Sequence, residues 1–578
     1  MKRHHLFILS FFKCCILLLA TSCSDFLEIT PQEIIVLDKF WNEEKDVENV
    51  VAGCYSAMQS QTVVERMMTW GEFRSDNVVG GTGIENETDL ANVFKENINA
   101  SNSFCKWGEF YNIINRCNTV LYYAPLVAEK DPGYTQSELK ATQAEVSALR
   151  DLMYFYLIRT FRDVPYYTVP YIDDNQVLDP PATSFDDVLD SLILDLEAVK
   201  TQAVRRYPTT KTGYQRGRIT QDAIHAMLCE MYLWKQDYQN AVRYADMVIE
   251  AKTQAYQEEL DKMSGMVSAT DRMIDGYPLI NDAFSSGNYY GSAFNSIFGN
   301  GNSRESIFEL IYADDDQMLP NNAVSLRYGN ASTFPGRARP ADFICTDVND
   351  EVFNIFLTKY DTRYYENLQP ISGSRTLFGI NKYSYTSAMV DLSKVELQAN
   401  YSGVYPEGYC HANWILYRLS DIMLMKAEAL VEMVNENDTV GVAKMRSDSL
   451  LNEAFAIVNT ISKRSNCSSG SKDLDQADYA TKQLMKALVL EERQRELMFE
   501  GKRWYDLVRR ARRDGNTNYL VGVVSRKGSS GGSAISSKLS RMEAIYWPYH
   551  NDEVKANHNL VQNPAFGSGE NTSYERTK

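Results

Sequence analysis

The stretch LMKALVLEERQRELMFEGKRWYDLVRR, residues 484–510, decides the fold of this chain. It is rich in strong helix formers, contains no proline and has a single glycine, Gly501, so we predict one helix over these residues. Three acidic residues recur at every fourth position and therefore lie on one helix face: Glu492, Glu496 and Glu500. Because like charges at this spacing repel one another, the face requires cations.

The acidic face has candidate counterions and apolar neighbours nearby in the sequence. Arg493, Arg495 and Arg503 each lie within a turn of one of the glutamates. Large apolar side chains are interleaved with these charges: Leu497, Phe499, Trp504 and Leu507. A solvated face would not need the aromatic residues, so we expect a partly buried ion network. The alternative is a catalytic carboxylate pair, whose two acids would need unequal environments.

The pattern E-R-x-x-E-L-x-x-E-G-x-R-W-x-D-L, residues 492–507, resembles the C-terminal signature of the SusD/RagB family. Residues 544–550 (AIYWPYH) and 559–566 (NLVQNPAF) resemble the end of the same family, with Tyr549 and Phe566 as departures from its pattern. Members of this family are outer-membrane lipoproteins that capture nutrients, usually glycans. The resemblance implies a surface-exposed glycan-binding protein whose partner is a SusC-like TonB-dependent outer-membrane transporter.

The composition of the 578-residue chain excludes several classes of function. Its formal net charge of −17 argues against a nucleic-acid partner, which favours a basic surface. The cysteines beyond residue 23 form no CxxC pair, which argues against a zinc site. Nucleotide and nucleophile motifs are absent. Together with the resemblance to a family of binding proteins, these absences lead us to expect no catalytic residues, no enzyme activity and no cofactor. Calcium at the acidic runs 173–174 or 314–316 is an alternative, although the EF-hand pattern is missing.

Residues 1–22 have the pattern of a lipoprotein signal peptide. Lys2 and Arg3 precede an apolar run that extends to Ala20 and is short for a membrane span. The small residues before Cys23 resemble a bacterial lipobox. We therefore expect lipidation of Cys23, which would anchor the mature chain in the outer membrane, exposed on the cell surface. An ordinary signal peptide followed by a coincidental cysteine is the alternative.

Helical periodicity dominates much of the chain. Residues 219–251 form the clearest unit, two predicted helices joined by a turn at residues 235–237. Small residues at Cys229 and Ala241 would let these helices approach closely, as in tetratricopeptide pairs. We predict a mainly α fold with little β structure, in which tetratricopeptide-like helix pairs form a scaffold. Generic helical hairpins are the alternative.

The sequence divides into a SusD-like N-terminal helical region, residues 23–262, and a C-terminal region, residues 263–578. Between residues 263 and 400, glycine, serine, asparagine and aromatic residues dominate, and only residues 305–312 (ESIFELIY) have the pattern of a strand. Long loops in a packed chain are usually functional or disordered, and the aromatic content argues against disorder. The C-terminal region would therefore contain a loop-rich insertion, followed by closing helices.

Two segments supply candidate ligand-binding residues. Sugar rings bind against flat aromatic faces while polar side chains bind the hydroxyl groups, and the sequence Asn288-Tyr289-Tyr290 has this chemistry. The polar candidates are Arg74, Asp76 and Asn77. They precede a polar, glycine-containing loop, residues 78–89, where the resemblance implies that loops line the ligand face. The alternative is that these side chains pack the loops against the helical body.

The function favoured by these observations is binding of a surface glycan and its delivery to the partner transporter. A secreted glycoside hydrolase is an alternative, because its acid and base are defined by their separation in space and would be hidden among 76 Asp and Glu residues. A helical-repeat scaffold that binds only protein is a further alternative.

Overall fold

The computed structural model describes residues 40–567, except residues 173–175, 178, 212, 264, 266, 269–270, 285–287, 313–319, 331–333, 346–354, 357, 359, 372–376, 395–396, 406–408, 439, 468–472 and 528–531. Cys23 and both acidic runs considered for calcium lie outside the described residues. Within the described ranges, no helix has both the length and the apolarity needed to span a bilayer.

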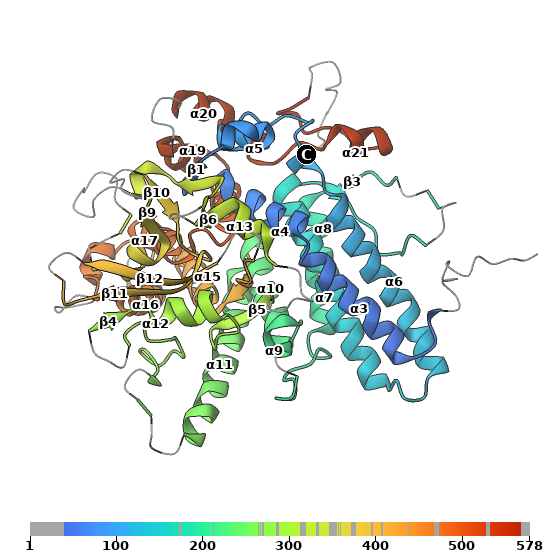
Figure 1. The fold of residues 1–578 in the computed structure, drawn as a ribbon, viewed down its shortest axis with the longest axis horizontal. Helices are drawn as coiled ribbons and strands as arrows, with labels where there is room; N and C mark the ends of the chain where they lie inside the picture. The colour runs from blue at the N-terminus through green and yellow to red at the C-terminus, as the bar shows by residue number, and fades with distance from the viewer. Residues whose placement is uncertain are drawn as a thin grey trace, which may run out of the picture.

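Long helices pack side by side through most of the protein (Figure 1). Each contacts the next in the order α3, α6, α7, α8, α10, α11, α15, and α15 also contacts α16 and α17. The loop-rich region lies between α11 and α15 in the sequence, and these two helices pack together. The bounds of the long helices are α3 (Glu44–Met58), α6 (Gly108–Lys130), α7 (Gln136–Phe161), α8 (Phe185–Val199), α10 (Gln221–Lys235), α11 (Tyr238–Lys262), α15 (Leu419–Glu432), α16 (Gly441–Ser465) and α17 (Lys482–Leu497). The mainly α, tetratricopeptide-like scaffold is thus confirmed.

The helix pair predicted at residues 219–251 corresponds to α10 and α11. Cys229 and Ala241 are fully buried, as close approach of the two helices requires. In the turn, Gln236 adopts a left-handed φ of 64°, and the Asp237 side chain accepts a hydrogen bond from the Asn240 amide at 3.1 Å. These residues end one helix and cap the start of the next.

The protein also contains shorter helices. They are α4 (Gln61–Met68), α5 (Thr88–Phe94), α9 (Tyr214–Gly217), α12 (Ser292–Phe294), α13 (Asn322–Tyr328), α14 (Thr362–Asn367), α18 (Arg503–Asp514), α19 (Asn518–Val524), α20 (Gly532–Leu539) and α21 (Asn551–Ala556), with the π-helical segment η2 (Thr69–Phe73) and the 3-10 segments η3 (Ile84–Asn86) and η4 (Ser103–Cys105). The last of the closing helices, from α19 onward, gather with α5 at one edge of the molecule (Figure 1).

The described strands are short and form small antiparallel sheets. The pairs are β1 (Val78–Gly80) with β8 (Ala338–Pro340), β2 (Val164–Pro165) with β3 (Ala182–Thr183), β5 (Ser306–Leu310) with β13 (Trp414–Arg418), β6 (Gly329–Asn330) with β7 (Phe334–Pro335), β9 (Leu368–Pro370) with β10 (Phe378–Ile380), and β11 (Tyr385–Asp391) with both β12 (Gln398–Val404) and β4 (Tyr289–Tyr290). The predicted strand at residues 305–312 is confirmed as β5. The expectation that it would be the only strand in the loop-rich region is wrong, because partners brought together by the fold pair segments whose own patterns are weak.

The single helix predicted over residues 484–510 is also wrong. Helix α17 ends at Leu497 and α18 begins at Arg503. Between them, Phe499 and Gly501 have φ values of 69° and 72°. The Glu72 carboxylate accepts hydrogen bonds from the amides of Phe499 at 3.0 Å and Lys502 at 3.3 Å. These contacts replace hydrogen bonds of a continuous helix, so a residue distant in the sequence ends α17.

Candidate functional site

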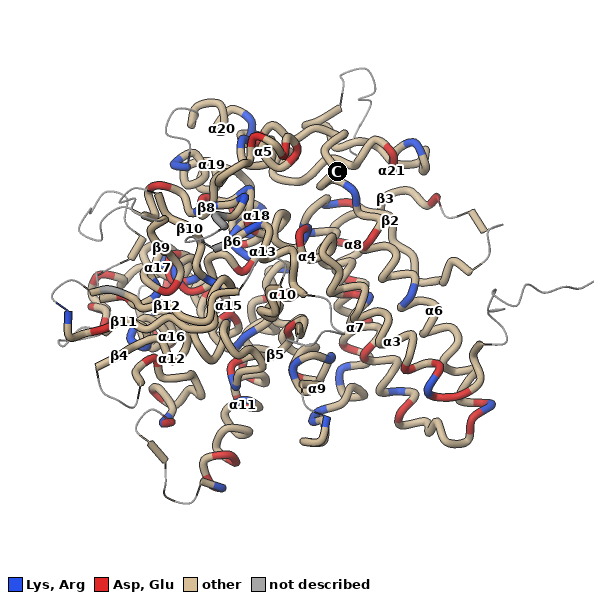
Figure 2. The backbone as a smooth tube through the Cα atoms, in the orientation of Figure 1, with Lys and Arg blue, Asp and Glu red and all other residues tan. Residues whose placement is uncertain are grey.

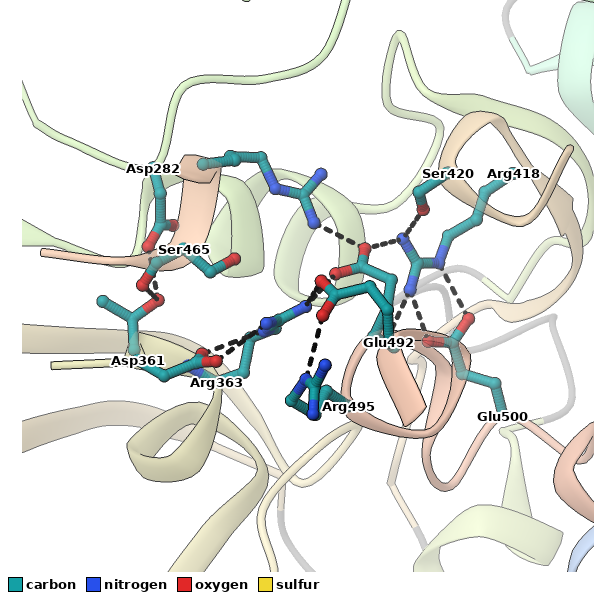
Figure 3. Close-up of polar contacts among 12 residues, drawn as sticks. Asp282, Asp361, Arg363, Arg418, Ser420, Ser465, Glu492, Arg495 and Glu500 are labelled. Atoms are coloured by element: carbon teal, nitrogen blue, oxygen red, sulfur yellow. Dashed lines mark hydrogen bonds and ion pairs between the residues drawn. The ribbon is translucent and has the colours of Figure 1, made fainter. Parts of the chain in front are cut away.

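Glu492, Glu496 and Glu500 lie in a buried ion network (Figure 3). Glu496 accepts hydrogen bonds from Arg418 at 2.6 Å and Arg363 at 3.1 Å, and it also pairs with Arg464. Glu492 accepts a hydrogen bond from Arg363 at 2.7 Å. The side chains of Arg363, Arg418 and Arg464 are each no more than 5% exposed, so the network is closed to a ligand.

Most cations that neutralise the acidic face are not the arginines predicted from the sequence. Of the three arginines predicted to neutralise the acidic face, only Arg495 contacts one of its glutamates, at 2.9 Å from Glu492. Arg493 and Arg503 pair with aspartates instead. Helical spacing shows which residues share a face, but it does not show which distant cations meet that face.

The electrostatics of this network do not fit a catalytic carboxylate pair. Burial opposes ionisation of Glu492, Glu496 and Glu500, but the adjacent cations outweigh it and hold the pKa of each carboxyl below its usual value. An acid and base at work need pKa values moved apart, whereas these three move in the same direction. We therefore interpret the network as a structural frame.

The polar candidates Arg74, Asp76 and Asn77 are also buried, each no more than 1% exposed. Arg74 pairs with Glu96 at 2.8 Å, and its guanidinium lies 4.3 Å from the ring centre of Trp504. Asp76 pairs with Arg503 at 2.8 Å. Asn77 contacts the side chains of Glu72 and Gln494. These residues connect the N-terminal helices to the segment around α17 and α18. Arg74 also lines a cleft of about 380 Å³ together with Glu96. A role of these three residues in ligand binding stays a prediction.

The aromatic candidates occupy a different place. Tyr289 and Tyr290 form β4 and pair with Asp391 and Val390 of β11. Both rings are half-buried, and Asn288 is exposed while its carbonyl accepts a hydrogen bond from the Leu392 amide. Figure 1 shows β4 far from β1, which directly follows Asn77. The structure therefore does not bring the two predicted groups of ligand residues together.

A cleft of about 530 Å³ lies beside the polar loop at residues 78–89. We name it the Glu87 cleft. Its walls come from α4, from the start of α5, from η4 and from α13, so four separate segments position its side chains. It is lined by Glu65, Arg66, Glu87, Thr88, Asp89, Leu90, Ser103, Phe104 and Arg327. Its volume lies within the range usual for small-ligand sites.

The charged groups of the Glu87 cleft hold one another in place. Arg327 pairs with Glu87 and, at 3.2 Å, with Glu65. Arg337 pairs with Glu87 at 2.8 Å. Burial opposes ionisation of Glu87, but the hydrogen bonds from Arg327 and Arg337 lower its pKa below the usual carboxyl value. The cleft thus presents fixed carboxylate acceptors and guanidinium donors, the groups that match hydroxyl-rich ligands.

Sequence reasoning found the neighbourhood of this cleft but not its residues. The loop at residues 78–89 ends at Glu87, Thr88 and Asp89, whereas Arg327 joins from a distant helix. The positions of Glu65 and Arg66 near the loop could not be predicted from helical spacing within α4, because they depend on the path of the chain in space. Among the residues that the structure describes, no group of three His, Cys, Asp or Glu side chains is arranged to hold a metal ion.

Comparison with known proteins supports the resemblance predicted from the sequence. Residues 358–566 match the SusD family model. This match confirms the similarity to the SusD/RagB family over the C-terminal part of the chain. Its curated relatives include SusD-like protein P38 of Formosa agariphila, 24% identical over 84% of this chain and 88% of the relative. SusD-like protein P25 of the same organism is 24% identical over 84% of this chain and 87% of the relative.

Solved structures of SusD proteins share the fold. A SusD superfamily protein from Bacteroides thetaiotaomicron aligns with a TM-score of 0.63 at 21% identity, covering 91% of this chain and 99% of the other. A laminarin-binding SusD-like protein aligns with a TM-score of 0.55 at 19% identity, covering 91% of this chain and 100% of the other. These likenesses support the helical architecture of this chain.

The SusD family match and the Glu87 cleft occupy different parts of the chain. The matched residues 358–566 include the cations Arg363, Arg418 and Arg464 and the glutamates of the buried network. All residues that line the Glu87 cleft lie before residue 358. The family match therefore identifies the frame, and the ligand has to be inferred from the cleft itself.

Proposed function

We propose that this SusD-family protein binds a glycan at the cell surface and delivers it to a SusC-like TonB-dependent transporter. The observation that carries the proposal is the Glu87 cleft, where carboxylates, guanidinium groups and the Phe104 ring from four segments converge. The laminarin-binding SusD-like protein of similar fold supports a glycan as the ligand class. Lipidation at Cys23 would hold the protein at the outer membrane beside its partner.

The binding mechanism follows from the chemistry of the cleft. Glu65, Glu87 and Asp89 accept hydrogen bonds from sugar hydroxyls, and Arg327 donates to their oxygens. Because the Arg327 guanidinium already holds two of these carboxylates, they are ordered before the ligand arrives, which reduces the entropy lost on binding. Phe104 also lines the cleft and supplies an apolar surface.

The same geometry favours capture over hydrolysis. A glycosidase acid keeps its proton at neutral pH because its pKa is raised. In the Glu87 cleft, Arg327 lies between Glu65 and Glu87, and the pKa of Glu87 is lowered. A carboxylate held in this way accepts hydrogen bonds but is a poor proton donor. Intact ligand would then pass to the transporter.

The experiment compares Glu87→Gln with Glu85→Gln, an exposed residue of the same loop that does not line the cleft. Affinity electrophoresis and calorimetry on a polysaccharide panel would identify a ligand of the wild-type chain. Loss of a charged hydrogen-bond partner should weaken binding by roughly tenfold in Glu87→Gln, with Glu85→Gln unchanged. Equal binding by both variants would remove the cleft from the site, and cleavage of any glycan by the pure protein would replace capture with hydrolysis.

Tyr289 and Tyr290 remain a second proposed contact surface, apart from the Glu87 cleft. A double Tyr289→Ala, Tyr290→Ala variant should remain folded and lose glycan affinity if ligand reaches β4. Tyr122→Ala, which removes a 52% exposed tyrosine of α6, is the matched control. Unchanged affinity in the double variant would assign both tyrosines to packing of the sheet.

A further inference from the structure

A second cleft, of about 370 Å³, lies between α9, α11 and the chain segment that precedes α9. We name it the Lys252 cleft. Seven of its lining residues are Lys or Arg and three are Asp or Glu, although the whole chain has a net charge of −17. Figure 2 shows basic segments grouped around α9 and the chain beside it. The cleft therefore has a local excess of positive charge, although the molecule as a whole is negatively charged.

Three of these cations are held by neutral oxygens. The Arg216 Nε donates to the Ser303 carbonyl at 2.7 Å. The Arg304 Nη2 donates to the Leu279 carbonyl at 2.7 Å, and the Lys252 Nζ donates to the Arg304 carbonyl at 3.2 Å. Within the described part of the chain, none of Arg216, Lys252 and Arg304 forms an ion pair with a carboxylate. The Nε of Arg304 is buried and has no acceptor there.

This arrangement contrasts with that of the ion network. There the buried Arg363, Arg418 and Arg464 meet carboxylates directly, whereas the partly buried Arg216, Lys252 and Arg304 do not. Bringing cations together without a counterion is unfavourable, and an anion that enters the cleft removes that cost. Three acids also line the cleft. Glu258 is already paired with Arg206, while Asp222 and Glu259 act on Lys252 and Arg216 at longer range and form no ion pair with them in the described part of the chain.

The state of Lys252 agrees with an unneutralised cluster. Burial, and then the positive charge of Arg216, lower its pKa to about 8. The other charged groups that face it are Asp222 from α10 and Glu305 and Glu309 at β5, which act in the opposite direction. Their effect is not sufficient to restore the ordinary lysine pKa. A bound anion would stabilise the protonated amine and raise this pKa.

We propose that the Lys252 cleft binds the carboxylate or sulfate group of an acidic saccharide. The saccharide part rests on the proposed glycan-binding function, whereas the anionic part rests on the cluster itself. Arg216 and Arg304 offer planar donors suited to carboxylate and sulfate oxygens, and Lys252 adds a point charge. Tyr207 lines the same cleft and supplies apolar surface for the sugar ring.

The test uses the intact chain and three oligosaccharides of matched length: an oligogalacturonide, a sulfated galactan and a neutral galactan. Calorimetry at low and physiological salt would give each affinity, and sodium sulfate would serve as the inorganic probe. At least one acidic oligosaccharide should bind tenfold more tightly than the neutral one, and salt should weaken it. The preferred acidic oligosaccharide identifies the anionic group as carboxylate or sulfate.

Variants locate the binding. Arg216→Gln and Lys252→Gln should each weaken acidic-oligosaccharide binding about tenfold, while Lys140→Gln, an exposed lysine of α7, should not. Affinity of the wild type should fall about tenfold from pH 7 to pH 9 as Lys252 loses its proton, and Lys252→Gln should remove this dependence. Substitution of Lys252 also removes its hydrogen bonds to backbone carbonyls. A double variant of two exposed residues of the cleft, Arg205→Gln and Lys262→Gln, lowers the positive charge and leaves those hydrogen bonds intact.

The outcomes separate this inference from the proposed function. If neutral glycan binds and is lost in Glu87→Gln, but the Lys252-cleft variants change nothing, the function stands and the inference is overturned. Binding of inorganic sulfate with no binding of any acidic saccharide also overturns it. Acidic-saccharide binding that is sensitive to the Lys252-cleft variants and insensitive to Glu87→Gln supports it, even if the Glu87 cleft proves not to bind glycan.

Discussion

A single carboxylate, that of Glu496, meets three guanidinium groups inside the protein. Removing a charge from the water is costly, and the cost is offset here only because every partner is present and aligned. The three arginines come from β13, α14 and α16, so Glu496 joins the strand, loop and helical parts of the chain. The network stabilises the fold only when every member is present, because loss of any one of them leaves a buried charge uncompensated.

We expect Glu496→Gln to destabilise the fold by about 3–5 kcal/mol, because it leaves three buried arginines with one carboxylate fewer. Urea unfolding monitored by circular dichroism measures the difference in the free energy of unfolding between the variant and the wild type. Glu491→Gln, at a side chain that is 51% exposed on the same helix, should change the free energy of unfolding by less than about 0.5 kcal/mol. Similar values for the two variants would contradict the structural role of the network.

The buried pair Glu366 and Asp282 predicts a pH effect. Burial, and then the charge of Asp282, raise the pKa of Glu366 well above its usual value, and burial also raises that of Asp282. An acid whose pKa is raised in the folded state contributes stability that is complete below its unfolded pKa and is lost as the pH rises toward its folded pKa. Glu366→Gln cannot ionise and should therefore have a higher Tm than the wild type at pH 8, with a smaller difference at pH 4.

Thermal unfolding at several pH values checks this expectation. The exposed Glu436→Gln variant serves as the control, and its difference from the wild type should not vary with pH. A Glu366→Gln difference that is constant from pH 4 to pH 8 would show that this carboxyl does not gain a proton on folding.

At the scale of elements, the break between α17 and α18 depends on close backbone packing. A Cβ atom at Gly71 in η2 would lie 1.8 Å from the carbonyl oxygen of Gly501. We expect Gly71→Ala to cost about 3 kcal/mol, since the backbone must move to accept it. Gly522→Ala in α19 is the control, because no neighbouring atom lies within 4 Å of the place its methyl group would take. It should be neutral or stabilise the helix by up to about 1 kcal/mol, measured by chemical unfolding.

The elements also show what the sequence can and cannot predict. The pair α10 and α11 was predictable because its spacing, small residues and turn all lie within residues 219–251. The end of α17 was not, because Glu72 forms it from 427 residues away. Arg74, Asp76 and Asn77 have the same side-chain chemistry whether they bind a ligand or a buried partner. Only the position of Arg503 and Gln494 in space distinguishes the two roles.

The location of the whole protein is predicted to depend on its lipid anchor. Cys23→Ala should release the protein from the outer membrane or prevent its delivery there, because the acyl chains that hold it would be missing. Fractionation of cells followed by immunoblotting measures this. Cys15→Ala, within the predicted leader, is the matched control and should leave the protein in the membrane fraction. Retention of Cys23→Ala in the membrane would mean that another contact provides the attachment.

The ion pair between Asp76 and Arg503 has a kinetic consequence. The two residues are 427 positions apart, so Asp76 cannot pair with Arg503 until nearly all of the polypeptide has been synthesised. Contacts of such long range slow folding, because the entropy of a very large loop is lost before the contact forms. The native state therefore assembles late, once the chain is almost complete. A chain cut short before Arg503 would be left with an unpaired charge in its interior and should be more sensitive to proteolysis.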